Sequence, residues 1–220
     1  MIITIDGPAG AGKSTAARRL ANSLGIAFLD TGATYRAVAW KLLQSGADLT
    51  DEPTVARTAA ETEVRLIPQD SKTVVYVDGR DVTEQIRSSE VTEGVKYVAS
   101  CVPARTVLVA LQRKIGRQLG SFVAEGRDQG SVVFPNANIK IYLEASPAER
   151  AQRRQAELSA RGEQASVEDV HKAILDRDRR DMSREVGPLV APEDAIHVDT
   201  SGKNIEQVAE ELLAIVKERL

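Results

Sequence analysis

The chain has very few of the residues that build disulfides, zinc sites and histidine-dependent active sites. Its 220 residues include one cysteine, Cys101, and two histidines, His171 and His197. A single cysteine cannot form an internal disulfide, which fits a reducing compartment. The two histidines are far apart in the sequence and lack zinc-ligand spacing, and they argue against a histidine-based catalytic triad. The chemistry of this chain is therefore expected to depend on other side chains.

Long apolar runs and an excess of basic charge are also missing. No stretch approaches the roughly 20 apolar residues that a membrane span needs. Residues 1–6 show neither the basic leader nor the apolar length of a signal peptide, so we expect a cytoplasmic protein without a membrane partner. With 29 basic and 32 acidic residues the net charge is -3. This balance argues against nucleic acid as a partner, because binding its backbone needs a surplus of Lys and Arg.

Arginine, by contrast, is abundant. It supplies 20 of the 29 basic residues, and lysine supplies the other nine. A guanidinium group binds phosphate or carboxylate through two parallel hydrogen bonds, whereas an ammonium group acts as a single charge. The imbalance therefore indicates fixed anion-binding sites rather than diffuse surface charge.

Apolar runs and helical patterns alternate along most of the chain. The β-branched run at 2–5 is followed by a glycine loop and by a segment, 13–24, with apolar residues at helical spacing. Further short apolar runs predict strands at 26–29, 122–124, 139–143 and 195–198, and apolar spacing or capping residues predict helices at 33–43, after Ser146, after Ser166 and over 205–216. Five strands separated by helices predict a parallel, doubly wound α/β sheet with helices on both faces.

One stretch departs from this alternation. Residues 63–67 and 73–77 alternate apolar and polar side chains, and the segment Pro68–Lys72 between them is typical of a turn. Asp78-Gly79 offers a second turn toward residues 80–82. The sequence therefore predicts a small antiparallel sheet inserted into the α/β core.

Residues 7–15 match the phosphate-binding loop (P-loop) pattern G-x-x-x-x-G-K-[ST], and they lie between a predicted strand and a predicted helix. In such a loop, glycines let backbone N–H groups turn toward phosphate oxygens, and the helix N-terminus adds its positive dipole end. The lysine can reach the β- and γ-phosphates, and the first hydroxyl can bind Mg²⁺. We therefore expect ATP to contact Gly7, Pro8, Ala9, Gly10, Ala11, Gly12, Lys13, Ser14 and Thr15.

Two polar segments follow predicted strands and point to a second anion site. Asp30–Arg36 follows the second strand, and Glu125–Asp128 follows the strand at 122–124. Because ligands of open α/β sheets bind beyond the carboxyl ends of the strands, both segments are expected near the phosphate-binding loop. Glu125 stands where a carboxylate can hold Mg²⁺ through water. A GTPase is unsupported, because none of the asparagines at 22, 136, 138 and 204 begins an Asn-Lys-x-Asp motif.

Together with the late segment Arg177–Arg184, these motifs resemble the bacterial cytidylate kinases in their order and spacing. The resemblance runs from about Ile2 to the C-terminal helix. It implies phosphoryl transfer from ATP to CMP or dCMP. It also implies one P-loop kinase domain made of a core at 1–55, 97–148 and 185–220, a nucleoside-monophosphate-binding insertion at about 56–96, and a helical lid at about 149–184. We also expect Mg²⁺ as cofactor and a monomeric protein.

The resemblance also implies roles for single residues. Thr31 stands near the acceptor, Arg36 and Arg127 look like clamps on its phosphate, and Arg105 and Asp128 resemble residues that read the cytosine edge. Arg177 and Asp181 resemble ribose contacts, and Arg184 resembles a closing phosphate contact; at helical spacing these three share a face. The lid arginines Arg150, Arg153 and Arg154 are expected near ATP, and the catalytic set is Lys13, Arg36, Arg127 and Arg184.

The chain departs from the family pattern at three places. Lys96 stands in Val95–Ala99 where the family commonly has a serine that helps to recognise the base, Pro103 lies one residue nearer Arg105 than usual, and Gln129 replaces an apolar residue. Lys96 can still donate to a pyrimidine carbonyl, so we predict weakened discrimination against UMP. Two alternatives stay open: a P-loop kinase for another acceptor, such as UMP, AMP or shikimate, and a nucleotide-sensing module that transfers nothing.

Overall fold

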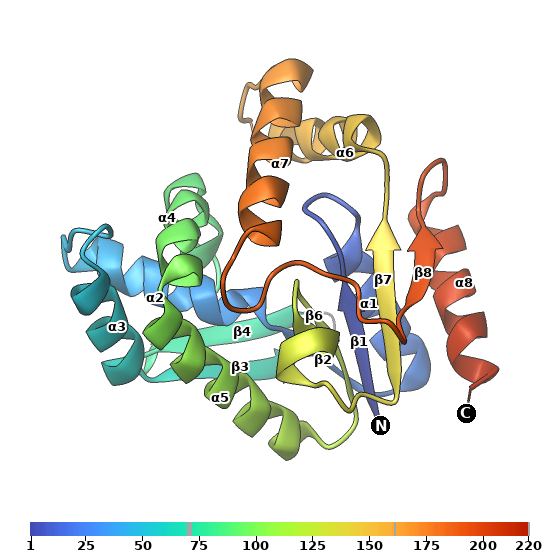
Figure 1. Ribbon diagram of the computed structural model, residues 1–220, viewed down its shortest axis with the longest axis horizontal. Helices are drawn as coiled ribbons and strands as arrows, with labels where there is room; N and C mark the ends of the chain where they lie inside the picture. The colour runs from blue at the N-terminus through green and yellow to red at the C-terminus, as the bar shows by residue number, and fades with distance from the viewer. Residues whose placement is uncertain (70–71, 161, 220) are drawn as a thin grey trace. The chain divides into compact units, whose positions relative to one another are not determined.

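A five-stranded parallel sheet, drawn in Figure 1, forms the core of the fold. The computed structural model describes residues 1–69, 72–160 and 162–219. The strand order is β2-β6-β1-β7-β8, and the strands are β1 (Ile2–Asp6), β2 (Ala27–Asp30), β6 (Phe122–Glu125), β7 (Ile139–Glu144) and β8 (Ile196–Asp199). All five predicted strands are confirmed to within one residue at either end.

By its internal contacts the chain divides into two compact units. The first unit comprises Met1–Ile26 and Val123–Leu220, and the second comprises Ala27–Phe122. In the first unit, Ile3 of β1 pairs with Ile139 of β7, and Ile141 of β7 pairs with Ile196 of β8. The helices α1 (Lys13–Leu24) and α8 (Ile205–Lys217) pack against each other, and both confirm predicted helices.

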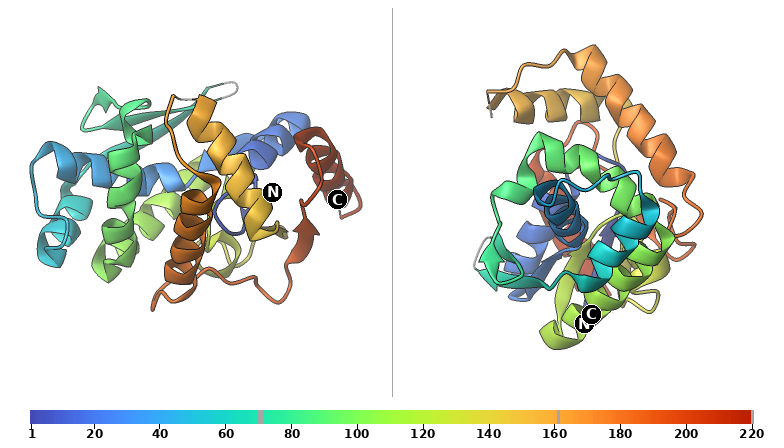
Figure 2. Two further views of the ribbon diagram at one scale, coloured as in Figure 1. Left: turned by 90° about the horizontal axis from the view of Figure 1, so that it is seen from above. Right: turned by 90° about the vertical axis from the view of Figure 1, so that its left-hand side faces the viewer.

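The other two helices of the first unit form a pair. They are α6 (Pro147–Ala160) and α7 (Val167–Met182), and both views in Figure 2 show them in contact. Ala151 of α6 packs against Val170 and Ile174 of α7. Ser146 and Ser166 accept hydrogen bonds from the third residue of each helix, which confirms both predicted N-termini.

The second unit contains the predicted antiparallel sheet. Its strands are β3 (Val64–Gln69), β4 (Lys72–Val77) and β5 (Arg80–Asp81), in the order β3-β4-β5. The register pairs Val64 with Val77 and continues to Gln69 opposite Lys72, so the strands extend into the segment expected to be a turn. Positions 70 and 71 of that segment lie outside the described residues. The predicted insertion is thus confirmed as a sheet, with longer strands than expected.

Helices make up the rest of the second unit. They are α2 (Gly32–Gln44), α3 (Glu52–Glu61), α4 (Ser89–Ser100) and α5 (Val102–Leu119). Their apolar faces meet in one cluster with the antiparallel sheet, for example through Val38, Val55, Val98 and Leu108. In the described part of the chain, no single helix is long and apolar enough to cross a membrane, and α4 with α5 reaches that composition only as a pair bent by 101° at its break.

Candidate active site

The P-loop begins with a glycine that no other residue can replace without strain. Gly7 follows β1 with φ +148°, and a Cβ at this position would lie 2.2 Å from the carbonyl oxygen of Leu143 in β7. The loop therefore leaves the sheet by passing directly against the neighbouring strand. It ends where α1 begins at Lys13, so the N-terminus of α1 faces the loop as the pattern predicts.

Lys13 and Ser14 are held by protein atoms. The Nζ of Lys13 donates to the carbonyl oxygen of Pro8 at 2.7 Å, and the side chain is buried. This burial, followed by the charge of Arg127, lowers the pKa of Lys13 well below its ordinary value. The Ser14 hydroxyl donates to Oε1 of Glu125 at 2.9 Å, and Glu125 ends the buried strand β6. Hydroxyl and carboxylate oxygens are the ligands that Mg²⁺ prefers.

Three arginines converge on one buried carboxylate, Asp181 of α7. The Nε of Arg127 donates to its Oδ2 at 3.0 Å, Arg184 bonds to its Oδ1, and Arg177 lies 3.9 Å away. Burial alone would raise the pKa of Asp181, but the three guanidinium groups outweigh it and hold the pKa below its ordinary value. Arg184 lies beyond the end of α7 and reaches back to Asp181, whereas the sequence placed it on the helix. Arg127, Arg177 and Arg184 nevertheless lie around the same carboxylate.

Asp6, at the end of β1, holds the segment that follows Arg127 and Asp128. Its two carboxylate oxygens accept hydrogen bonds from the backbone N–H groups of Gln129 at 2.9 Å and Gly130 at 2.7 Å. These residues open a π-helical turn, Gln129–Val133. Sequence reasoning gave Asp6 no role, although an acidic residue that ends a buried strand is itself a signal, because such a charge needs partners. Gln129, which stands where the family pattern has an apolar residue, is thus held to the core strand β1 through its backbone N–H.

Asp6 is expected to give stability an unusual pH dependence. Burial raises its pKa from 3.8 to about 6, against the opposing effect of the two backbone hydrogen bonds. Between these pH values the folded state binds more protons than the unfolded state, so the free energy of unfolding falls as pH rises. The decrease amounts to about 3 kcal/mol, and it is complete above pH 6.

Urea unfolding of the wild type and of Asp6→Asn at pH 4 to 7 measures this effect. The variant has no carboxyl to titrate, and it also loses one acceptor for the two N–H groups. The stability advantage of the wild type over the variant should therefore shrink as pH rises from 4 to 6. Parallel pH profiles for the two proteins would contradict the assignment.

In the second unit, Asp30 organises the segment predicted to contact an acceptor. Its Oδ1 accepts a hydrogen bond from the backbone N–H of Ala33 at 3.0 Å, at the start of α2. Its Oδ2 pairs with Arg36 at 2.7 Å and lies 3.9 Å from Arg87. Asp30 and Arg87 had no predicted role. Two guanidinium groups beside one carboxylate leave a net positive charge, and such a site can bind an anion.

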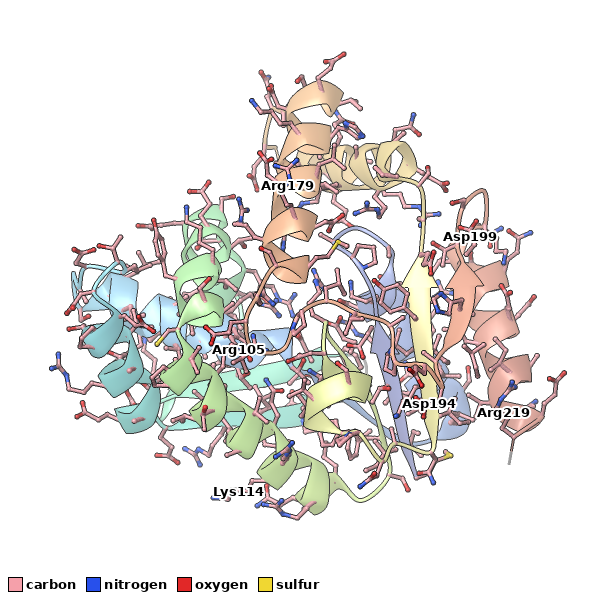
Figure 3. The ribbon with its side chains drawn as sticks, in the orientation of Figure 1. Arg105, Lys114, Arg179, Asp194, Asp199 and Arg219 are labelled. Carbon is pink, nitrogen blue, oxygen red and sulfur yellow. The ribbon has the colours of Figure 1, made fainter. Side chains whose placement is uncertain are left out.

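Thr31 and Arg105 are also fixed within the second unit. The carbonyl oxygen of Thr31 accepts from Thr34 and from the buried amide of Gln112 on α5, at 3.4 Å. Arg105, labelled on α5 in Figure 3, is buried with its guanidinium 5.5 Å from the centroid of the Tyr35 ring. Such stacking holds a guanidinium plane in one orientation. Lys96 is exposed on α4, with its Nζ 4.9 Å from the centroid of the Tyr97 ring.

The three arginines of α6 that were expected near ATP have different partners, although the sequence placed them on one helix face. Arg150 is buried against Ala9 of the P-loop. Arg153 donates to the side chain and backbone of Thr200, at 3.0 and 2.6 Å. Arg154 is partly exposed and pairs with Glu157 of its own helix at 3.0 Å. The first unit thus gathers the P-loop, the Asp181 cluster and Arg150, and the described residues contain no group of three or more His, Cys, Asp or Glu side chains able to hold a metal ion.

Comparisons with known proteins show which proteins this chain is similar to. A family model described as cytidylate kinase matches residues 3–218. A protein named cytidylate kinase from Carboxydothermus hydrogenoformans is 48% identical over 98% of this chain and 97% of its own length. One of the same name from Rhodopirellula baltica is 48% identical over 99% of this chain and 93% of its own. The crystal structure of an uncharacterized protein from Eubacterium ventriosum shares the fold alone, with 9% identity, a TM-score of 0.55, and coverage of 99% and 98%.

Proposed function

The chain belongs to the cytidylate kinase family, and on that premise we propose that it transfers the γ-phosphate of ATP to CMP or dCMP. The products are ADP and CDP or dCDP. The observation that carries this proposal is the match over residues 3–218, and a P-loop pattern whose lysine and serine begin α1 supports it. We propose a cytoplasmic monomer that needs no nucleic-acid or membrane partner.

The reaction needs positioning and charge neutralisation more than a strong base. A phosphate oxygen of CMP attacks the γ-phosphorus in line; the new O–P bond forms as the bond from γ-phosphorus to the bridging oxygen breaks, and ADP leaves. P-loop N–H groups hold the phosphates of ATP. Lys13 exchanges the carbonyl oxygen of Pro8, at 2.7 Å, for phosphate oxygens. Arg36, Arg127 and Arg184 neutralise the charge that develops in the transition state.

We propose that Mg²⁺ is held by Ser14, with Glu125 behind it through a water molecule. The two side chains already meet at 2.9 Å, and their oxygen donors fit this hard cation. When bound, the ion neutralises charge on the β- and γ-phosphates. In this chain Glu125 orients the Ser14 hydroxyl, and its burial at the end of β6 fixes the carboxylate in place.

The acceptor contacts are assigned as the family resemblance implies. In the second unit Arg36 binds the CMP phosphate, Thr31 lies close to it and Arg105 reads the base. In the first unit Arg127 and Arg184 contact the CMP phosphate and Asp128 reads the base. Arg177 and Asp181 contact the ribose. We further propose that residues 149–184 form a lid carrying Arg150, Arg153 and Arg154, that 56–96 form the monophosphate-binding insertion, and that 1–55, 97–148 and 185–220 form the core. Lid closure excludes water, which would otherwise compete as the phosphoryl acceptor.

A panel of acceptors in one coupled ADP assay tests the proposed function. CMP and dCMP should give the largest kcat/KM, and UMP, AMP and shikimate smaller values. Preference for one of the latter would identify a different P-loop kinase. Isothermal titration without CMP binding would instead favour a nucleotide sensor. The convergence of Arg127, Arg177 and Arg184 on Asp181 favours the kinase, because a sensor needs no second phosphate site.

Lys96 is expected to weaken discrimination against UMP. Its exposed ammonium group can donate to a pyrimidine carbonyl, which CMP and UMP both have, whereas a serine can also accept from the amino group of cytosine. Lys96→Ser should therefore raise the ratio of kcat/KM for CMP to that for UMP several-fold, an effect of about one hydrogen bond. Equal ratios in the wild type and the variant would contradict this role.

A further inference from the structure

A buried ion pair joins the two lid helices where they meet the P-loop. Arg150 lies in the first turn of α6 and Asp178 lies near the end of α7, with relative exposures of 4% and 8%. The Nη1 of Arg150 is 2.6 Å from Oδ2 of Asp178. A buried pair of this kind contributes little net stability compared with apolar residues of similar size, so its presence calls for another explanation.

The same pair holds both backbone polar groups of one P-loop residue. Oδ1 of Asp178 accepts a hydrogen bond from the N–H of Ala9 at 3.3 Å, and Nη1 of Arg150 donates to the carbonyl oxygen of Ala9 at 2.9 Å. The Nε of Arg150 donates to the carbonyl oxygen of Ala145, at 3.0 Å, and so fixes the guanidinium plane. Ala9 is therefore held at both its donor and its acceptor by charged groups from two helices.

The next loop residue is packed against the same arginine. A Cβ at Gly10 would lie 3.1 Å from the Cβ of Arg150 and 3.1 Å from its carbonyl oxygen, and the φ of Gly10 is +78°. This position thus requires glycine both for its conformation and for the approach of α6. The peptide between Ala9 and Gly10 has little freedom to rotate. Its orientation sets the direction in which the following N–H groups of the loop point.

We propose that Arg150 and Asp178 are positioning residues that hold the P-loop in its ATP-binding shape and tie that shape to the lid helices. The inference rests on the proposed function only in taking ATP as the ligand. It assigns Arg150 to the backbone of Ala9 rather than to ATP itself, in contrast to the lid-arginine role that the family resemblance implies. A loop fixed before binding loses less conformational freedom when phosphate enters, so ATP affinity depends on the pair.

Asp178→Asn tests the pair with the smallest change of shape. The amide of asparagine keeps one oxygen acceptor, but its NH₂ group takes the place of the other oxygen. That NH₂ group then faces another donor, either the N–H of Ala9 or the guanidinium of Arg150. We expect the KM for ATP and the Kd for ATP without acceptor, from isothermal titration, to rise about tenfold, the cost of one charged hydrogen bond. The KM for CMP should change less than about twofold. Asp176→Asn is the matched control, because Asp176 forms an exposed pair with Arg179 on the same helix, where Figure 3 labels Arg179.

A second variant separates positioning from stability. In the double variant Arg150→Met and Asp178→Leu, apolar side chains replace the pair, which should leave the melting temperature close to that of the wild type. Its Kd for ATP should still rise about tenfold, because Ala9 has lost both partners. An unchanged Kd for ATP in this folded variant, or an equal rise in the KM for CMP, would overturn the proposal. Because the Kd is measured without an acceptor, the test holds even if CMP proves not to be the substrate.

Discussion

Lys13→Ala is expected to abolish ADP formation in the presence of ATP and CMP. Lys13 is the buried lysine of the P-loop, and its Nζ donates to the carbonyl oxygen of Pro8 at 2.7 Å. On binding ATP it would donate to phosphate oxygens in place of this carbonyl. Removal of a positioned cation from the site of phosphoryl transfer typically costs about 10³-fold or more in rate. A coupled assay for ADP at saturating ATP and CMP measures the loss directly.

The same variant is expected to fold normally. Burial disfavours the charged form of Lys13 and lowers its pKa, so an ammonium group at this position destabilises the folded state. Removing it should leave the free energy of unfolding unchanged or higher, as is common where function and stability conflict. Lys114→Ala is the control, because Lys114, labelled in Figure 3, is exposed on α5. CMP-dependent turnover that survives in folded Lys13→Ala would refute the assignment of the site.

Features encoded by a continuous stretch of sequence could be predicted, and the strands show why. Residues of central parallel strands are buried on both faces, so each such strand appears in the sequence as a short apolar run, as at residues 122–124 of β6. The P-loop is also local, because its glycines, lysine and hydroxyl must follow one another. The serine caps of α6 and α7 act over three residues. In each case the residues that determine the structure lie within one turn or one strand of each other in the sequence.

Polar residues whose partners are distant in the sequence could not be predicted in this way. Asp6 bonds to Gln129 and Gly130, more than 120 positions away, and Asp178 bonds to Ala9, 169 positions away. No spacing rule connects such pairs. The end of a buried strand marks Asp6 as an acid that needs partners, but it does not say which residues those partners are. The fold of the first unit makes these contacts, because it brings together the end of β1, the segment after β6, the P-loop and the last turns of α7.

The three arginines of α6 show a related limit of helical patterns. Arg150, Arg153 and Arg154 lie within about 100° of one another around α6, because successive residues turn by about 100°. That arc is wide enough to meet three different surroundings: the P-loop at Arg150, Thr200 at Arg153, and the helix's own Glu157 at Arg154. The pattern indicated where the arginines cluster, but the neighbouring elements determine what each one binds.

Asp181→Asn is expected to have the largest effect on stability and a large effect on turnover. Asp181 is 4% exposed and is the shared partner of Arg127, Arg177 and Arg184. The amide has the shape of the carboxylate but no charge, so the three guanidinium groups repel one another without compensation. Loss of one side of a buried ion pair costs about 3 kcal/mol in the free energy of unfolding. Turnover should fall by roughly 10²-fold or more, because Arg127 and Arg184 lose the group that orients them.

The pH dependence distinguishes this charge effect from a simple packing defect. Because the folded pKa of Asp181 lies below its ordinary 3.8, the carboxylate stabilises the protein above that pH and ceases to do so as pH falls through the folded pKa. The difference in unfolding free energy between wild type and Asp181→Asn should be constant from pH 5 to 7 and shrink below about pH 4.

Arg177→Ala provides the matched comparison for this cluster. Arg177 is 3.9 Å from Asp181 and its side chain is 43% exposed, so its removal leaves the carboxylate with two closer partners and should cost little stability. If the Asp181→Asn variant were as stable as the Arg177→Ala variant, the idea that the Asp181 carboxylate holds the three arginines together would be wrong. If Asp181→Asn were less stable by the same amount at pH 3 and pH 7, packing rather than charge would account for the loss.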